Sequence, residues 1–259
     1  RYIHKNGKIV WAEIKTTLRY VECGNPDFFI TEIIDITLRK KAELAIIRDK
    51  SRLESVHRMS NYQAANVADF ILDIVRPFGI TTNDFSSNIA FDNDDLDTAS
   101  DFVNKMGKDK QHRLIGIHVG AGKPQNKWSL NKYIKLVALL EKNYKCCFYI
   151  TGSKFDKEEL NYVKEKSKVT IHQYIDHSIP EVAALISISD LYLTNDTGLM
   201  HVAGTTQTPQ ISLFGQTNPF NWAPYGKDKI FVRKSDLIDD IEAEDVFEIC
   251  KLLLNKSDG

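Results

Sequence analysis

The sequence has no long apolar run and few cysteines. No stretch approaches the roughly 20 consecutive apolar residues that cross a bilayer, and no charged and apolar leader opens the chain. The four cysteines form no CxxC pair, and no cluster of His, Cys or carboxylate residues has the spacing of metal ligands. We therefore expect a cytoplasmic protein with reduced thiols and no bound metal, which makes at most peripheral contact with a membrane.

An excess of charge of either sign is also lacking. The chain carries 34 basic and 35 acidic residues, besides seven histidines. This balance argues against a nucleic-acid partner, because nucleic-acid surfaces are broadly basic. An anionic small ligand would have to be held by a few local groups, and no cofactor is predicted. With 42% hydrophobic and 27% charged residues, the 259-residue sequence is typical of a globular protein with one large or two modest domains.

Residues 1–45 have the pattern of antiparallel strands followed by a helix. Asn6-Gly7 has the turn chemistry of a two-residue hairpin, and apolar and polar side chains alternate within residues 8–22. A further strand is expected over residues 28–34. The charged stretch that begins at Leu38 then predicts a helix start, with Asp35 or Thr37 as its cap.

Residues 46–110 are predicted to form a helical connector and linker. Apolar residues recur at helical spacing until Pro77 ends the pattern. Residues 81–101 are rich in Asp and Asn, which would suit Ca²⁺, but their spacing does not match the D-x-[DN]-x-[DN]-G loop with its distant Glu. A solvated linker is therefore predicted for this stretch.

Residues 111–259 alternate between strand and helix patterns. Short apolar runs predict strands over residues 114–119, 145–150, 169–171, 191–194 and 210–214. Between and after them, helical patterns cover residues 130–142, 157–165, a stretch from 179, 199–202 and 243–254. Such repetition predicts an α/β fold with a Rossmann-like parallel sheet that has helices on both faces.

Three loops that follow strands carry the chemistry of a ligand site. The carboxyl ends of parallel strands lie at one edge of a sheet, so we expect these loops to converge on one ligand. The first combines glycines for close backbone approach with lysines for an anionic group, at Gly120, Ala121, Gly122, Lys123 and Lys127. The second, residues 151–159, offers carboxylates that suit ribose hydroxyls, and its candidate site residues are Gly152, Ser153 and Glu159. The third is the turn Asp196, Thr197 and Gly198, with His201 in the helix after it.

Each loop also has a purely structural interpretation. Asp196 or Thr197 could simply cap a helix, and Lys127 could be a solvated residue at a helix start. Asp-Thr-Gly also marks aspartic proteases, which share a proton between two carboxylates. The sequence contains one such triplet, and it leads into a helical pattern, so the protease interpretation is disfavoured.

Residues 1–45 resemble the C-terminal half of a PAS domain. The resemblance rests on these stretches: His4-Lys5-Asn6-Gly7, Ile9-Val10-Trp11, Gly24 with Pro26, Asp35-Ile36-Thr37 and Arg39-Lys40-Lys41-Ala42-Glu43. The helical half that walls a PAS ligand pocket has no counterpart here. A three-stranded sheet without a ligand is the alternative interpretation.

Residues from about 55 to 254 resemble the C-terminal, donor-binding half of the family nine glycosyltransferases, the lipopolysaccharide heptosyltransferases. The matching stretches are Ile117-His-Val-Gly-Ala-Gly122, Trp128, Thr151-Gly-Ser153, Ile179-Pro-Glu-Val-Ala-Ala-Leu185, Asn195-Asp-Thr-Gly-Leu-Met-His201, residues 209–219 and Trp222-Ala-Pro-Tyr-Gly226. The resemblance implies a GT-B half that binds a nucleotide-activated sugar, typically ADP-heptose, for transfer to a lipopolysaccharide core acceptor. It places Asp196, Thr197, Gly198 and Leu199 at the donor diphosphate and sugar.

Two departures from the family pattern matter. The family commonly has Lys-x-Trp before its first helix, whereas Asn126 occupies the lysine position here, and Lys127 or Lys123 would have to replace it. The family's acceptor domain, which supplies the general base of an inverting transfer, is not recognised in residues 1–45. We therefore expect the chain alone to bind an ADP-sugar but to transfer it poorly. The alternative is a PAS-linked signalling or association module with a non-catalytic nucleotide-sugar-binding domain.

Overall fold

The structure is a computed structural model that describes residues 2–3, 9–10, 12–20, 26–35, 67, 72, 76–82 and 86–256. The chain divides into two compact units. Among the described residues, those up to 35, 72 and 76–81 belong to the first unit, and 67, 82 and 86–256 belong to the second. The two units are described separately.

The first unit contains two antiparallel strand pairs. Strand β1 (Tyr2–Ile3) pairs with β2 (Ile9–Val10), and β3 (Ala12–Tyr20) pairs with β4 (Pro26–Asp35). A short 3₁₀ helix, η2 (Arg76–Phe78), contains the predicted stop at Pro77. The antiparallel strands predicted for this stretch are thus present, while the Asn6-Gly7 turn and the helix start after Thr37 lie outside the described residues.

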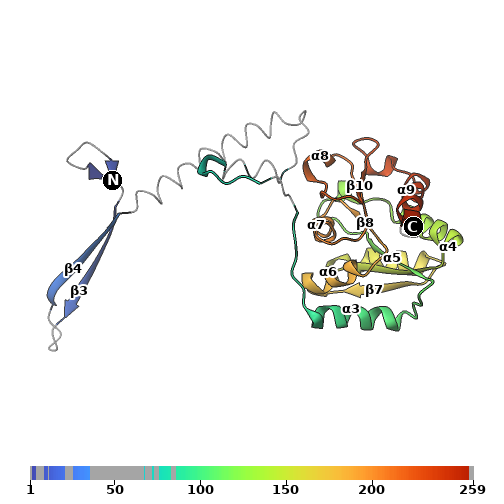
Figure 1. Cartoon of the computed structure of the whole chain (residues 1–259), viewed down its shortest axis with the longest axis horizontal. Coiled ribbons are helices and arrows are strands. Elements are labelled where there is room, and N and C mark those ends of the chain that lie inside the picture. Colours follow the sequence, from blue (N-terminus) through green and yellow to red (C-terminus); the bar gives the residue numbers. More distant parts are fainter. Residues whose placement is uncertain are drawn as a thin grey trace. The chain divides into compact units, whose positions relative to one another are not determined.

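The second unit is built on a six-stranded sheet in the order β10-β9-β8-β5-β6-β7, and all of its neighbouring strands are parallel. This confirms the predicted α/β fold. Figure 1 shows the sheet with its helices. The strands are β5 (Arg113–His118), β6 (Cys146–Gly152), β7 (Ile171–Ile175), β8 (Leu191–Asn195), β9 (Gln210–Leu213) and β10 (Lys229–Val232).

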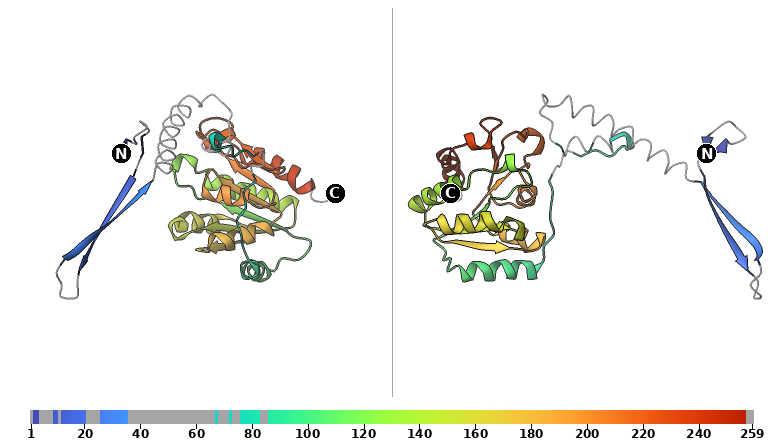
Figure 2. Two further views of the ribbon diagram at one scale, coloured as in Figure 1. Left: turned by 60° about the vertical axis from the view of Figure 1, so that its left-hand side comes forward. Right: turned by 180° about the vertical axis from the view of Figure 1, so that it is seen from behind.

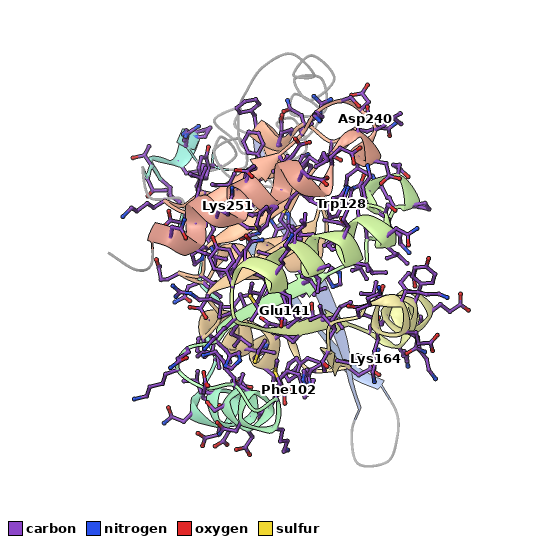
Figure 3. All side chains as sticks on the ribbon, turned by 90° about the vertical axis from the view of Figure 1, so that its right-hand side faces the viewer. Phe102, Trp128, Glu141, Lys164, Asp240 and Lys251 are labelled. Atoms are coloured by element: carbon purple, nitrogen blue, oxygen red, sulfur yellow. The ribbon has the colours of Figure 1, made fainter. Side chains whose placement is uncertain are left out.

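Helices cover both faces of this sheet, as the two views in Figure 2 show. One apolar core joins one face to α4 (Leu130–Asn143), α5 (Lys157–Lys166) and α9 (Ala243–Lys256), and a second joins the other face to α3 (Asn93–Lys105), α6 (Ile179–Ser187) and α7 (Gly198–Gly204). The remaining short helices are η3 (Pro124–Asn126), η4 (Lys154–Asp156), α8 (Pro219–Trp222) and η5 (Ile238–Asp240). Figure 3 shows Glu141 on α4 and Phe102 on α3.

The two faces of the sheet differ in chemistry because side chains alternate along each strand. The face under α4, α5 and α9, here called the aliphatic face, is lined by Ile115, Ile117, Phe148, Ile150, Leu191, Leu193, Ile211 and Leu213. The opposite face, here called the tyrosine face, carries Tyr149, Tyr174 and Tyr192. A β-carbon added at Gly116 would lie 2.3 Å from Tyr149 Cζ and 2.6 Å from Tyr192 Cδ2. Gly116 therefore makes room for two tyrosine rings.

Helix α3 corrects the prediction of a solvated linker over residues 81–101. The helix begins after Asp92, whose carboxylate accepts the Asp95 backbone N–H, and the Asp95 carboxylate accepts the Asp92 N–H in return. Acidic residues there favour a helix start, because they accept the free N–H groups and complement the helix dipole. Ala99 on α3 is fully buried in the core of the tyrosine face. The Asp-rich composition thus marked a helix cap.

Other elements lie close to their predicted positions. Helix α6, predicted from residue 179, begins with a capping box between Ser178 and Glu181. Strand β7 runs four residues beyond its predicted end at Ile171, and β10 and α8 were not predicted. In the part of the chain that the structure describes, no helix has the length and apolar character to span a membrane.

Candidate functional site

The loops after β5, β6 and β8 meet at the carboxyl edge of the sheet, as predicted. Asn195, at the end of β8, is fully buried and joins the first loop to the third. Its Nδ2 donates to the carbonyl oxygens of Val119 (2.9 Å) and Gly120 (3.2 Å). Its Oδ1 accepts from Tyr133 Oη (2.9 Å) and from the Trp128 backbone N–H (3.3 Å). One amide side chain therefore fixes both ends of the glycine-bearing loop.

Asn126 makes a second link between these loops. Its Nδ2 donates to Asp196 Oδ2 at 2.9 Å, and its side chain is largely buried. Thr197 is the N-cap residue of α7, but its side chain makes no capping hydrogen bond. The interpretation that the Thr197 hydroxyl caps helix α7 is therefore wrong. The carboxylate of Asp196 is instead held by the residue at the family's lysine position.

Lys127 and Glu159 link the first loop to α5. Lys127 Nζ lies 2.5 Å from Glu159 Oε1, and both side chains are about one-quarter to one-third exposed. The sequence predicted a phosphate contact for Lys127 and a ribose contact for Glu159. In the structure the two charges face each other, so each neutralises much of the other's field.

Gly120 lies against two acceptor atoms that the sequence did not single out. A β-carbon added at Gly120 would lie 2.6 Å from Asp156 Oδ1 and 3.0 Å from His118 Nε2. The other carboxylate oxygen, Asp156 Oδ2, accepts from both the backbone N–H and the hydroxyl of Ser153 at 2.9 Å. The first two loops thus touch at Gly120, which explains why a side chain is absent there.

His118 is held in one tautomer by its surroundings. Its Nδ1 lies 2.9 Å from the Thr151 carbonyl oxygen, which can only accept, so Nδ1 carries the proton. Burial lowers the pKa of His118, against the opposing effects of this hydrogen bond and of Asp156. The ring is therefore neutral at pH 7, and Nε2 presents a lone pair beside Gly120. Within the described residues, Nε2 has no hydrogen-bond partner.

A buried hydroxyl network supports His118 from the tyrosine face. Thr151 Oγ1 lies 2.7 Å from Tyr192 Oη and 3.3 Å from His118 Nδ1. Tyr149 Oη lies 2.8 Å from Ser189 Oγ. These hydroxyls satisfy one another inside the protein, where an unpaired polar group would be costly.

The other predicted residues surround this centre with different exposure. Gly122, Lys123, Gly198 and His201 are exposed, whereas Ala121, Gly152, Ser153, Thr197 and Leu199 are partly buried. Desolvation lowers the pKa of His201, against the opposing effect of the Asp196 carboxylate. Gly152 is the last residue of β6, and the other twelve predicted residues lie on the three converging loops or on the first turns of the helices that follow them. Within the described residues, no group of three His, Cys or carboxylate side chains could hold a metal ion.

Four residues at this centre were missed as candidates. In the sequence, Asn126 is a departure from the family pattern, His118 and Asn195 occur only within stretches that match the family, and Asp156 is only one of several carboxylates of the second loop. The signal for His118 and Asn195 was their position, since each is the last residue of a strand whose carboxyl end faces the loops. Asp156 has capping-box spacing from Ser153, which was also visible in the sequence.

Known proteins with similar sequences or folds are named as heptosyltransferases or as glycosyl transferases of family 9. A curated relative, "Lipooligosaccharide heptosyltransferase 2" of Haemophilus ducreyi, is 28% identical over 148 residues, which are 54% of this chain and 42% of the relative. The fold is similar to that of a family 9 glycosyl transferase from Veillonella parvula, with a TM-score of 0.68, 22% identity and coverage of 74% of this chain and 60% of that one. It is also similar to the ADP-heptose lipopolysaccharide heptosyltransferase II of Escherichia coli, with a TM-score of 0.57, 22% identity and coverage of 66% and 54%.

The chain thus spans about half the length of these relatives. The comparisons give no support to the PAS-like interpretation of residues 1–45 or to a PAS-linked signalling role. The family model described as glycosyltransferase family 9 (heptosyltransferase) matches residues 40–248. Since this match covers most of the sequence, the chain belongs to glycosyltransferase family 9.

Proposed function

We propose that this chain binds an ADP-activated heptose and provides the donor side of a transfer to a lipopolysaccharide core acceptor. The proposal rests on the convergence of three loops, the first and third at Asn126 and Asp196 and the first and second at Gly120 and Asp156, together with membership of the family. A relative of similar fold is named as an ADP-heptose lipopolysaccharide heptosyltransferase. An inverting transfer needs groups that stabilise the departing nucleotide diphosphate, and a base that deprotonates the acceptor hydroxyl.

The groups proposed for the diphosphate lie on the first and third loops. The backbone at Gly198 and Leu199 is proposed to donate to phosphate oxygens, because the side chain of Thr197 makes no capping bond that would compete. Lys123, which is exposed, supplies positive charge. Lys127 contributes less while Glu159 pairs with it, so the lysine missing at Asn126 is best replaced by Lys123.

Asp156 and His118 are the better candidates for contacts with donor hydroxyls. Both Asp156 Oδ1 and neutral His118 Nε2 are acceptors, and both lie beside Gly120. A sugar hydroxyl donates hydrogen bonds, so two adjacent acceptors suit a diol and repel a phosphate. Glu159 is already paired with Lys127, which leaves it less able to accept from a ligand.

Calorimetric titration with ADP and with ADP-heptose tests the proposal. We expect the chain to bind both ligands and Asp196→Ala to weaken binding of each at least about tenfold, because the substitution removes the charged partner of Asn126. Asp101→Ala is the matched control, since Asp101 is an exposed residue of α3. Equal heats for the unsubstituted chain and Asp196→Ala would remove the site assignment. No heat for either ligand would overturn the proposed function.

A further inference from the structure

Helix α7 is too short to define its own position. It spans seven residues, fewer than the roughly 12 to 15 that make even a good isolated helix marginally stable. The Asp196-Thr197 turn leads directly into it, and the last helical residues lie at the opposite end, near Gly204. Whatever holds the carbonyl end of α7 therefore also sets the direction of the turn in the candidate site.

Lys229 holds that carbonyl end. Its Nζ reaches from the first residue of β10 to the carbonyl oxygens of Ala203 (2.8 Å) and Thr208 (2.7 Å). A positive charge near the last carbonyl groups of a helix is favoured by the helix dipole. Lys229 thus ties three segments together: β10, the end of α7 and the loop that enters β9.

Gln210 holds the same helix one turn earlier. It is paired in register with Lys229 on the neighbouring strand, and its Nε2 donates to the Met200 carbonyl oxygen at 2.9 Å. Gln210 is fully buried, yet its Oε1 has no hydrogen-bond partner. An unpaired buried oxygen is costly. An apolar residue would avoid that cost, so the amide is best explained by the bonds that its Nε2 makes, to α7 and to Ser212 Oγ at 3.0 Å.

Gly204 adds a contact that depends on close approach. A β-carbon at Gly204 would lie 2.6 Å from Pro224 Cβ, so the loop after α8 packs directly on the end of α7. Burial also lowers the pKa of Lys229 to about 8, with Asp228 opposing the shift. Keeping a charged amine in this position is therefore costly, which is typical of groups retained for a purpose other than stability.

We infer that Lys229 and Gln210 are positioning residues for donor binding, which act by fixing α7 behind the Asp196-Thr197 turn, Lys229 at the last turn of the helix and Gln210 at Met200 in its first turn. The inference rests on the proposed function. Neither residue is among those proposed to contact the donor, and both act through carbonyl oxygens of α7. They hold the Asp196-Thr197 turn in the orientation that ADP requires, so that ADP binding carries no entropy cost for ordering the turn.

The test measures ADP affinity and thermal stability in the same variants. We expect Lys229→Met and Gln210→Met each to weaken ADP binding about tenfold, and Lys229→Arg to recover most of the loss, because a guanidinium also donates to two carbonyl groups. Lys227→Met is the control for loss of charge, since Lys227 is exposed nearby. Leu254→Ala is the control for loss of stability, since Leu254 is buried on α9 away from α7.

The outcomes separate the inference from the proposed function. A Lys229→Met variant that binds ADP as tightly as the unsubstituted chain would overturn the inference alone, as would a loss no larger than that of Leu254→Ala at an equal fall in Tm. Failure of the unsubstituted chain to bind ADP would overturn both. If Lys229→Met does not fold, Gln210→Met and Lys229→Arg decide the question by the same comparison.

Discussion

The two faces of the parallel sheet bury different kinds of side chain. The aliphatic face is filled by Ile, Leu and Phe side chains, whereas the tyrosine face buries hydroxyl groups, and those of Tyr149 and Tyr192 bond to Ser189 and Thr151. The hydroxyl network ends at His118, beside the candidate site, and α7 packs on this same face. The difference indicates that the aliphatic face supplies most of the stability and that the tyrosine face places functional groups.

The largest effect is expected from the aliphatic face. Leu193 is buried in the core under α4 and α9, so Leu193→Ala should lower the free energy of unfolding by about 3 to 4 kcal/mol through lost burial and the cavity that remains. Urea unfolding followed by circular dichroism measures the change. Leu252→Ala, at a leucine that is 64% exposed, should change it by less than about 0.5 kcal/mol. Equal effects at both positions would contradict the assignment of the core.

Gly116→Ala tests whether the tyrosine face is as tightly packed. The added methyl group would lie 2.3 Å from Tyr149 Cζ, so a loss of about 2 to 3 kcal/mol is expected. The double variant with Tyr149→Leu should lose less than the sum of the two single variants, because the shorter side chain removes the overlap with Tyr149 and leaves only that with Tyr192. Gly122→Ala is the control, since no atom lies within 4 Å of its added β-carbon. Strict additivity in urea unfolding would show that the tyrosine ring moves aside freely.

Tyr192→Phe should have a smaller effect, because it removes one hydrogen bond and creates no cavity. The hydroxyl bonds to Thr151 Oγ1 at 2.7 Å, and the net value of such a bond is about 1 kcal/mol. Thr151 would keep its contact with His118. We therefore expect a small loss in urea unfolding and a perturbed imidazole signal of His118 in NMR spectra. An unchanged His118 signal would mean that the network stops at Thr151.

The sequence predicted the elements of the sheet better than it predicted the site. Strands such as β8 were predicted within a residue or two, because unbroken apolar runs bounded by turn residues leave little choice. Helix α3 was missed because its Asp-rich start was interpreted as solvated, although Asp92 and Asp95 cap it. Periodicity and turn chemistry are local properties, and they describe local structure well.

The site depended on which side chains pair across loops, and that is not a local property. Lys127 and Glu159 were assigned to different parts of one ligand, yet they are 32 residues apart and form an ion pair. Asn126 looked like a lost function at the lysine position, and its bond to Asp196 was not visible in the spacing. The positions of the loops followed from the rule for parallel sheets, whereas the partner of each charge required coordinates.

The smallest effect is expected from the titration of Lys229, whose amine binds the end of α7 on the tyrosine face. Its pKa is lowered by burial to about 8, from an ordinary value of 10.5, so between these pH values the unfolded chain binds more protons than the folded one. The free energy of unfolding therefore rises with pH in this window. The rise should be on the order of 1 kcal/mol, since the amine is partly exposed.

Subtracting the free energy of unfolding of Lys229→Met at each pH removes the titration of all other groups. The difference should shift in favour of the unsubstituted chain between pH 8 and 10, as measured by urea unfolding in matched buffers. A constant difference would contradict the lowered pKa, and would mean that the carbonyl oxygens of Ala203 and Thr208 compensate the ammonium group for its lost hydration.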